Sequence, residues 1–155
     1  MARMKLSCAV AAIVAVALSS CRMGDNDYSE YHTVDPQGWA YGDTLRYAFN
    51  PADTVVRGNL ALSVSHTNDY FYSNLYLEVT LSDSLTTRRD TVALQLADDF
   101  GRWNGRGIGT DFQFTENLAT DIALHRPVSI AVRHIMRDDC LTGIEQVGIS
   151  FDESR

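Results

Sequence analysis

The 155-residue sequence contains one lysine, Lys5, and only three cysteines, Cys8, Cys21 and Cys140. Lys5 lies in a short basic segment at the N-terminus, so the rest of the chain cannot use lysine for Schiff-base or nucleophilic chemistry. Arginine and lysine together number 13, against 20 acidic residues, and the formal charge is −7. Nucleic-acid-binding proteins need a basic surface, so this balance argues against nucleic acid as a partner.

The sequence also lacks the short motifs that mark common enzymes. It contains no G-x-S-x-G, no H-E-x-x-H and no phosphate-binding Gly-Lys-Ser/Thr, and its four histidines are scattered. Gly101 to Gly109 is glycine-rich, but without that phosphate-binding ending it is predicted to be a loop. We therefore predict no catalytic residue, no metal site and no cofactor. A hydrolase built from dispersed carboxylates stays open as an alternative, because spacing alone cannot identify such a pair.

One acidic stretch offers an alternative to this metal-free prediction. Asp98, Asp99, Asn104 and Asp111 carry the oxygen ligands that calcium prefers. Their spacing is not that of an EF-hand, and acidic turn residues are ordinarily solvated. We therefore interpret them as turn residues, with calcium binding as the competing hypothesis.

The N-terminus has the composition of a secretory signal peptide. Arg3 and Lys5 precede an uncharged run from Leu6 to Leu18. As a helix this run would span roughly 20 Å, which is shorter than the roughly 30 Å hydrocarbon core of a membrane. Residues 1–20 are therefore predicted to be a signal peptide and not a membrane span.

The signal peptide is followed by a cysteine in a characteristic context. Leu18-Ser19-Ser20-Cys21 resembles the bacterial lipobox, in which small residues admit the peptidase and the cysteine receives a diacylglycerol. Cys21 is the predicted lipidation site, and it would become the first residue of the mature chain. Two or three fatty chains, such as palmitate, would hold the protein on the membrane. The competing interpretation is a plain signal peptide with an incidental cysteine.

Lipidation would leave Cys140 as the only free thiol of the mature chain, which excludes an intradomain disulfide. Cys140 follows two aspartates, which would raise its thiol pKa and oppose thiolate formation. We therefore expect a buried or half-buried structural cysteine. Loss of Arg3 and Lys5 leaves 11 basic and 20 acidic residues, a formal charge of −9.

The mature chain has the length of one domain and the pattern of an all-β fold. Residues 21–35 are predicted to be the lipidated cysteine and a polar spacer, and residues 36–155 a folded domain. Apolar and polar residues alternate in five segments: 59–65, 75–82, 91–96, 128–133 and 147–152. Turn-forming pairs such as Asn50-Pro51 and Asn104-Gly105 separate them. We expect seven to nine strands in an antiparallel β-sandwich, most simply of jelly-roll type.

Several segments, in order along the chain, resemble one known family. They are Trp39 to Leu45, Tyr70 to Leu77, Asp90 to Val92 leading to Gly101 to Gly107, and Met136 to Ile144 with Val147 to Ile149. Behind the lipobox, this series is similar to the gliding-motility-associated lipoprotein GldH family. The resemblance implies an envelope lipoprotein of the outer membrane, associated with the gliding machinery and the linked protein-secretion apparatus. It implies no enzymatic activity and supplies no catalytic residue.

Four residues in these segments are candidate partner-binding residues: Trp103, Tyr72, Asn74 and Arg137. Trp103 is either a cap over the open end of the sandwich or an exposed platform for a sugar ring or a partner side chain. Tyr70, Phe71 and Tyr72 raise the same question, and strand packing is the favoured interpretation.

The expected function is that of a non-catalytic lipoprotein that docks onto or scaffolds other envelope proteins. A membrane-tethered carbohydrate-binding module is the main alternative.

Overall fold

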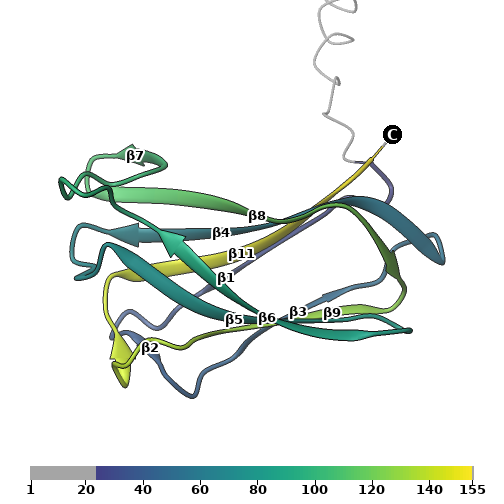
Figure 1. Cartoon of the computed structure of the whole chain (residues 1–155), viewed down its shortest axis with the longest axis horizontal. Helices are drawn as coiled ribbons and strands as arrows, with labels where there is room; N and C mark the ends of the chain where they lie inside the picture. Colours follow the sequence, from purple (N-terminus) through teal and green to yellow (C-terminus); the bar gives the residue numbers. More distant parts are fainter. Residues whose placement is uncertain (1–23, 155) are drawn as a thin grey trace, which may run out of the picture.

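The computed structural model describes residues 24–154, which form an all-β sandwich of antiparallel sheets (Figure 1). The five-stranded sheet contains, in spatial order, β1 (Tyr28–Thr33), β11 (Ile144–Glu153), β4 (Val55–Thr67), β8 (Asp111–His125) and β7 (Arg106–Ile108). The four-stranded sheet contains β3 (Leu45–Phe49), β9 (Val128–His134), β5 (Asn74–Ser82) and β6 (Thr87–Gln95). A small third sheet pairs β10 (Cys140–Leu141) with β2 (Trp39–Ala40). The predicted antiparallel sandwich is confirmed, whereas the predicted signal peptide and Cys21 lie outside the described residues.

The eight main strands follow the jelly-roll order. Counted along the chain without β2, β7 and β10, strands one, eight, three and six form one sheet, and strands two, seven, four and five form the other. This order is that of two Greek keys folded onto each other, so the jelly-roll prediction is also confirmed. Within residues 24–154 there is no helix that could span a membrane.

Jelly-roll connectivity gives the two ends of the sandwich different characters. Four long connections, residues 34–44, 68–73, 96–110 and 135–143, lie at one end, which we call the distal end. Three short connections, residues 50–54, 83–86 and 126–127, lie at the other. The first described residues and the C-terminus share this second end, which we call the tether end (Figure 1).

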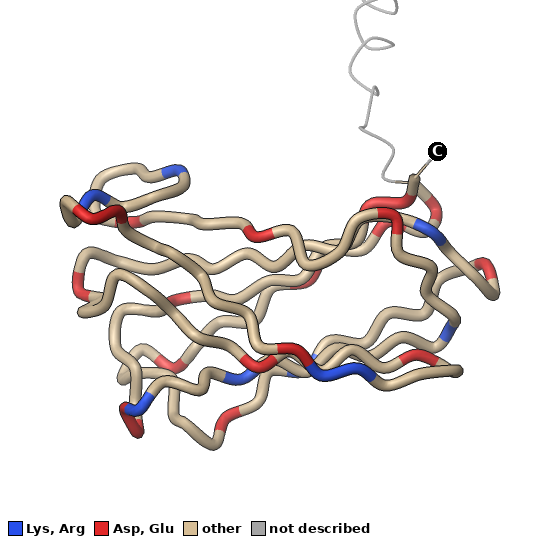
Figure 2. The backbone as a smooth tube through the Cα atoms, in the orientation of Figure 1, with Lys and Arg blue, Asp and Glu red and all other residues tan. Residues whose placement is uncertain are grey.

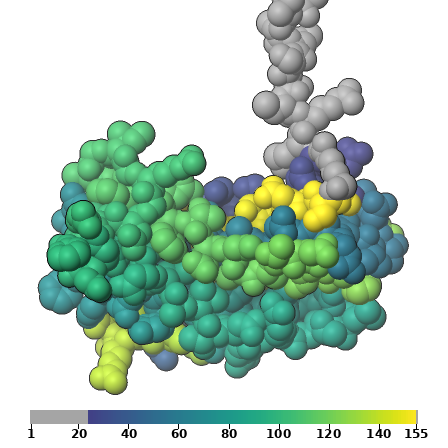
Figure 3. Space-filling model, turned by 45° about the horizontal axis from the view of Figure 1, so that its top comes forward, coloured from purple at the N-terminus to yellow at the C-terminus, as the bar shows by residue number. Residues whose placement is uncertain are grey.

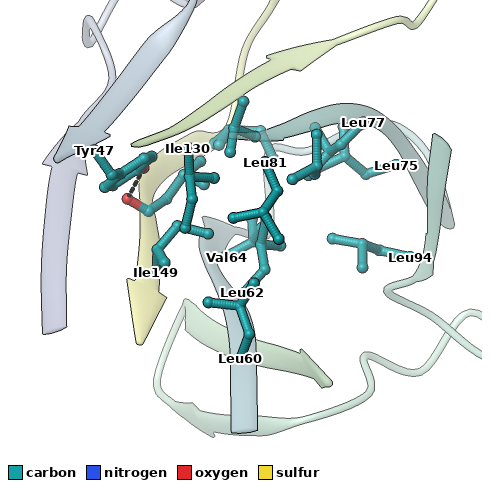
Figure 4. Close-up of a cluster of buried hydrophobic side chains, with 14 of the residues drawn as sticks. Tyr47, Leu60, Leu62, Val64, Leu75, Leu77, Leu81, Leu94, Ile130 and Ile149 are labelled. Atoms are coloured by element: carbon teal, nitrogen blue, oxygen red, sulfur yellow. Dashed lines mark hydrogen bonds between the residues drawn. The ribbon is translucent and has the colours of Figure 1, made fainter. Parts of the chain in front are cut away.

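The core lies between the two sheets. Alternate residues of each strand point inward, and Leu62, Val64 and Ile149 of the five-stranded sheet are fully buried against side chains of the four-stranded sheet, including Leu75 and Leu77 (Figure 4). Each such side chain contributes about 1.5–3 kcal/mol by leaving water. One polar contact crosses the core, because the Tyr47 hydroxyl donates a hydrogen bond of 2.7 Å to the Val147 carbonyl.

The prediction of a spacer through Asp35 is wrong for residues Tyr28–Thr33. They form β1, which pairs with β11 from Tyr28↔Phe151 to Thr33↔Gln146. Asn26, just before β1, is 4% exposed and donates to Asp53 at 2.9 Å and to Glu153 at 3.0 Å. The folded domain therefore begins well before residue 36.

The expectation of a buried Cys140 is also wrong. Cys140 is exposed in the two-residue strand β10, whereas its neighbour Leu141 points inward and is buried. Alternation along the strand explains the difference, because only one of two adjacent side chains can face the core.

Candidate functional site

All four candidate partner-binding residues lie at the distal end. Tyr72 lies in the β4–β5 connection, and Asn74 begins β5. Trp103 lies in the long β6–β8 connection and Arg137 in the β9–β11 connection. These residues come from distant parts of the sequence, and the jelly-roll connectivity brings them to one end of the molecule.

The β4–β5 connection ties its two neighbouring loops together. Its residue Asn68 accepts a hydrogen bond of 2.9 Å from the indole Nε1–H of Trp103. At the other side of the connection, the Tyr72 hydroxyl donates to Asp138 at 2.7 Å, and this bond raises the pKa of Tyr72. Tyr70 donates to the Asn74 carbonyl at 2.8 Å. Three of the long loops therefore form one connected surface.

Trp103 packs as a cap and is not a free platform. Its side chain is half-buried against the core, and its ring centroid lies 4.6 Å from that of His66 and 6.0 Å from that of Phe112. An isolated bridge between Ala97 and Trp103 fixes the backbone. This geometry corresponds to the cap interpretation, since the indole covers the distal end of the core.

His66, beneath Trp103, is fully buried. Its Nδ1 lies 3.1 Å from the Thr67 carbonyl, which can only accept, so Nδ1 carries the proton and Nε2 keeps its lone pair. Nε2 has no hydrogen-bond partner among the described residues. Burial lowers the pKa of His66, although the Thr67 carbonyl and the charge of Glu145 oppose the shift. A neutral, enclosed imidazole of this kind serves packing.

Arg137 is exposed and forms no ion pair with another described residue. Arg133, in the preceding strand β9, does form an ion pair: its guanidinium lies 2.9 Å from Glu78 on the outer face of the four-stranded sheet. Arg137 is therefore available to an acidic group on a partner.

The most exposed apolar side chains lie beside these candidates. Phe71, Phe100 and Ile108 are 85%, 85% and 90% exposed, and all three belong to distal connections or to the short strand β7. Tyr70 to Tyr72 form a connection and not the expected strand, but Tyr70 is buried and Tyr72 packs against the core as the packing interpretation predicts, whereas Phe71 points outward. Sequence reasoning missed Phe100 and Ile108. The sequence pattern that could have indicated them is a large apolar residue between glycine or aspartate residues in a predicted loop.

The acidic stretch considered for calcium is used for turn formation. Asp98 accepts hydrogen bonds from the backbone N–H groups of Arg102 and Phe100 and from the Arg102 guanidinium, and these contacts lower the pKa of its carboxyl group. Asn104 donates to the Gln95 carbonyl at 2.9 Å. Across residues 24–154, no group of three or more His, Cys, Asp or Glu side chains is placed to hold a metal ion.

The fold and this surface define a single jelly-roll domain whose long connections lie at the end opposite the first described residues and the C-terminus. The sequence profile of the GldH lipoprotein family matches residues 26–151, and the chain belongs to that family. Membership implies a membrane-anchored protein of the cell envelope related to gliding motility. No curated protein matches the sequence closely enough to count as a relative.

Solved structures share only a distant likeness with the chain. Dimeric latent PorU from Porphyromonas gingivalis is 12% identical over 88% of this chain and 14% of its own, with a TM-score of 0.32. FLHE is 9% identical over 83% of this chain and 96% of its own, with a TM-score of 0.34. A family two carbohydrate esterase from Cellvibrio japonicus is 12% identical over 82% of this chain and 35% of its own, also at 0.34. The chain thus spans about one seventh of PorU, and at these TM-scores the likeness supports no functional conclusion.

Proposed function

We propose that this protein is an outer-membrane lipoprotein, anchored through Cys21, that docks onto the gliding and protein-secretion machinery through its distal end. It acts by binding and scaffolding, without catalytic turnover. The family relationship supports the envelope setting, and the distribution of exposed apolar residues supports the docking end.

The placement of Phe71, Phe100 and Ile108 carries the proposal. Exposed apolar side chains that gather on one part of a surface mark interaction sites, because their burial by a partner is favourable. The only comparably exposed large apolar residue elsewhere among the described residues is Leu85, 69% exposed in the β5–β6 turn at the tether end. Aromatic anchors of this kind supply most of the energy in many interfaces.

The tether end is suited to lie close to the membrane. Five peptide links separate Cys21 from Asn26, a length of at most about 18 Å when fully extended. Asn26 is itself fixed to the folded domain by the Asp53 and Glu153 carboxylates. The anchor therefore holds the tether end near the bilayer and presents the distal loops to partners away from it.

The test is co-purification of envelope proteins with the tagged lipoprotein from solubilised membranes. Replacing Phe71, Phe100 and Ile108 together by serine should abolish co-purification of gliding or secretion proteins and leave the thermal midpoint unchanged, because these side chains are exposed. Leu85→Ser is the matched control, since it removes an exposed apolar residue at the opposite end. Unchanged co-purification by the triple variant, or equal loss with Leu85→Ser, would contradict docking by the distal end.

A further inference from the structure

A groove lined by both polar and apolar side chains lies on the outer face of the five-stranded sheet near its distal end. This open groove has a volume of about 870 Å³, within the roughly 300–1,000 Å³ typical of small-ligand sites. Its floor is one row of residues that face each other across adjacent strands: Gln113, Ser65, Gln146 and Thr33. Gly107 and Ile108 of β7 form one wall, and the segment around β7 projects above the sheet surface that β1 and β11 continue (Figure 3).

The floor is prepared for hydrogen bonding and is not used by the protein itself. None of the four floor side chains makes a hydrogen bond to another described residue. The hydroxyls of Ser65 and Thr33 can both donate and accept, and so can the amides of Gln113 and Gln146. Sugar hydroxyl groups have the same double capacity, so each floor residue can form a hydrogen bond with a ligand hydroxyl.

The two rows of this face next to the floor contain no charged residue. These rows are Thr115, Ser63, Gly148 and Tyr31, then Asn117, Ala61, Ser150 and Ser29. Arg106, Asp111 and Glu145 line only the margin of the groove. On the opposite sheet, by contrast, charged residues of both signs lie along the strands (Figure 2), and Arg133 and Arg89 pair with Glu78 on its outer face. This uncharged part of the face favours a neutral ligand. A charged ligand would give up its hydration there without an opposite charge to pair with.

An aromatic ring lies beside the groove. Tyr31 is 46% exposed, and its ring covers Gly148 so closely that a Cβ atom at position 148 would lie 2.3 Å from two ring carbons. The absence of a side chain at Gly148 thus lets the ring rest on the sheet. An amphipathic ring held in this way offers contact area at little cost in conformational freedom.

We propose that this groove and the adjoining face bind a neutral glycan chain. Gln113, Ser65, Gln146 and Thr33 hydrogen-bond to sugar hydroxyls, and the ring of Tyr31 contacts a sugar ring. Ile108 and Phe112 are the large apolar residues of the lining, but the four floor residues are polar and offer no pocket for an apolar anchor, so a protein segment fits the floor less well. Ile108 borders both the groove and the distal docking surface, but the four floor residues and Tyr31 belong to strands of the sheet and not to the distal connections.

The experiment uses the full-length lipoprotein in a detergent without a sugar headgroup, run on native gels that contain a soluble polysaccharide. Dextran, galactomannan and xyloglucan are the neutral probes, and polygalacturonate is the acidic comparison. At least one neutral polymer should retard the protein, and polygalacturonate should not. The double variant Gln113→Ala/Gln146→Ala should weaken retardation at least tenfold, and Ser65→Trp, which fills the floor, should abolish it.

Gln37→Ala is the matched control, because Gln37 is an exposed glutamine of a distal loop outside the groove. It should be retarded like the wild type, and all variants should keep the wild-type thermal midpoint. The proposal fails if no neutral polymer retards the protein, if only polygalacturonate does, or if the groove variants bind as well as Gln37→Ala.

Discussion

At the residue scale, the half-buried side chain of Trp103 packs against the core on one side and is exposed on the other. One face of the indole lies against His66 and Phe112, and its Nε1–H is satisfied by Asn68. Removal of the ring would open a path for water to the buried imidazole and leave the Asn68 oxygen without its donor. The residue therefore supports the loop surface from below, whereas Phe100 in the same connection is exposed and free of this role.

Trp103→Ala should destabilise the protein by about 2–3 kcal/mol, less than the about 3–5 kcal/mol of a fully buried aromatic residue, because Trp103 is half-buried. The expected fall in thermal midpoint is on the order of 10 °C for a domain of this size. Thermal unfolding followed by circular dichroism measures it, with Phe100→Ala as the control of nearly unchanged midpoint. A Trp103→Ala variant with normal stability but lost partner association would instead make the indole a direct contact.

Residue-level exposure is the part of the site that the sequence predicted least well. Trp103, Tyr72, Asn74 and Arg137 could be chosen from their types and motifs, but which of Tyr70, Phe71 and Tyr72 faces outward depends on the bend of the connection. Tyr70 turns inward to donate to the Asn74 carbonyl, which forces Phe71 outward. Contacts between loops decide such orientations, and the local pattern of polar and apolar residues does not contain them.

At the scale of the elements, Asp83 links the two sheets at the tether end. It lies in the β5–β6 turn of the four-stranded sheet, where its Oδ1 accepts from the backbone N–H groups of Leu85 and Thr86 at 2.9 and 2.8 Å. Its Oδ2 accepts from the backbone N–H of His125, at the end of β8 in the other sheet, at 3.0 Å. Burial raises the pKa of the carboxyl group, but these hydrogen bonds outweigh burial and lower the pKa to about 2.

This depressed pKa makes Asp83 a source of acid-sensitive stability. The carboxylate stabilises the fold by about 1–2 kcal/mol above pH 4, and this contribution should disappear as the pH falls from about 4 towards 2. In Asp83→Asn, an amide N–H group would face a backbone N–H donor. The variant should therefore lack this contribution of about 1–2 kcal/mol even at pH 7. Urea unfolding of both proteins at pH 7, 4 and 2.5 should show a difference that shrinks with acid. A difference independent of pH would assign the effect to packing, and Asp99→Asn, in an exposed turn, provides the control.

The strands that the sequence revealed are those with regular alternation. The five predicted segments correspond to β4, β5, β6, β9 and β11. β1 was missed because its inward positions include Glu30 and His32, which bond to each other at 2.9 Å at the edge of the sheet. β8 was missed because Glu116 occupies an inward position and because the pairing with β4 shifts register near Leu60. Strands at a sheet edge or with bulges lack the regular alternation of apolar and polar residues, so the sequence pattern does not predict them.

At the scale of the whole molecule, the proposed function gives the sandwich one attached end and one interacting end. β4, with 13 residues, runs nearly from one to the other, a length of about 40 Å at about 3.3 Å per residue. Asp53 and Asp152 lie at the tether end, where their charge opposes contact with an anionic membrane surface, whereas Asp121 at this end is paired with Arg57. The proposed lipid on Cys21 and this repulsion would together favour an upright domain, with its distal loops about 40 Å beyond the tether end.

Upright orientation can be measured with Cys140, which is exposed at the distal end and is the only cysteine among the described residues. A fluorophore on Cys140 should escape quenching by spin-labelled lipid headgroups in reconstituted vesicles. The same fluorophore on Leu85→Cys, in a Cys140→Ser background, should be strongly quenched, because residue 85 lies at the tether end. Cys21→Ala should abolish the quenching of the Leu85→Cys label and should release the protein from membranes after an alkaline wash. Equal quenching at both positions would mean that the domain lies flat, and its uncharged sheet face would then be the surface to examine for contact with the bilayer.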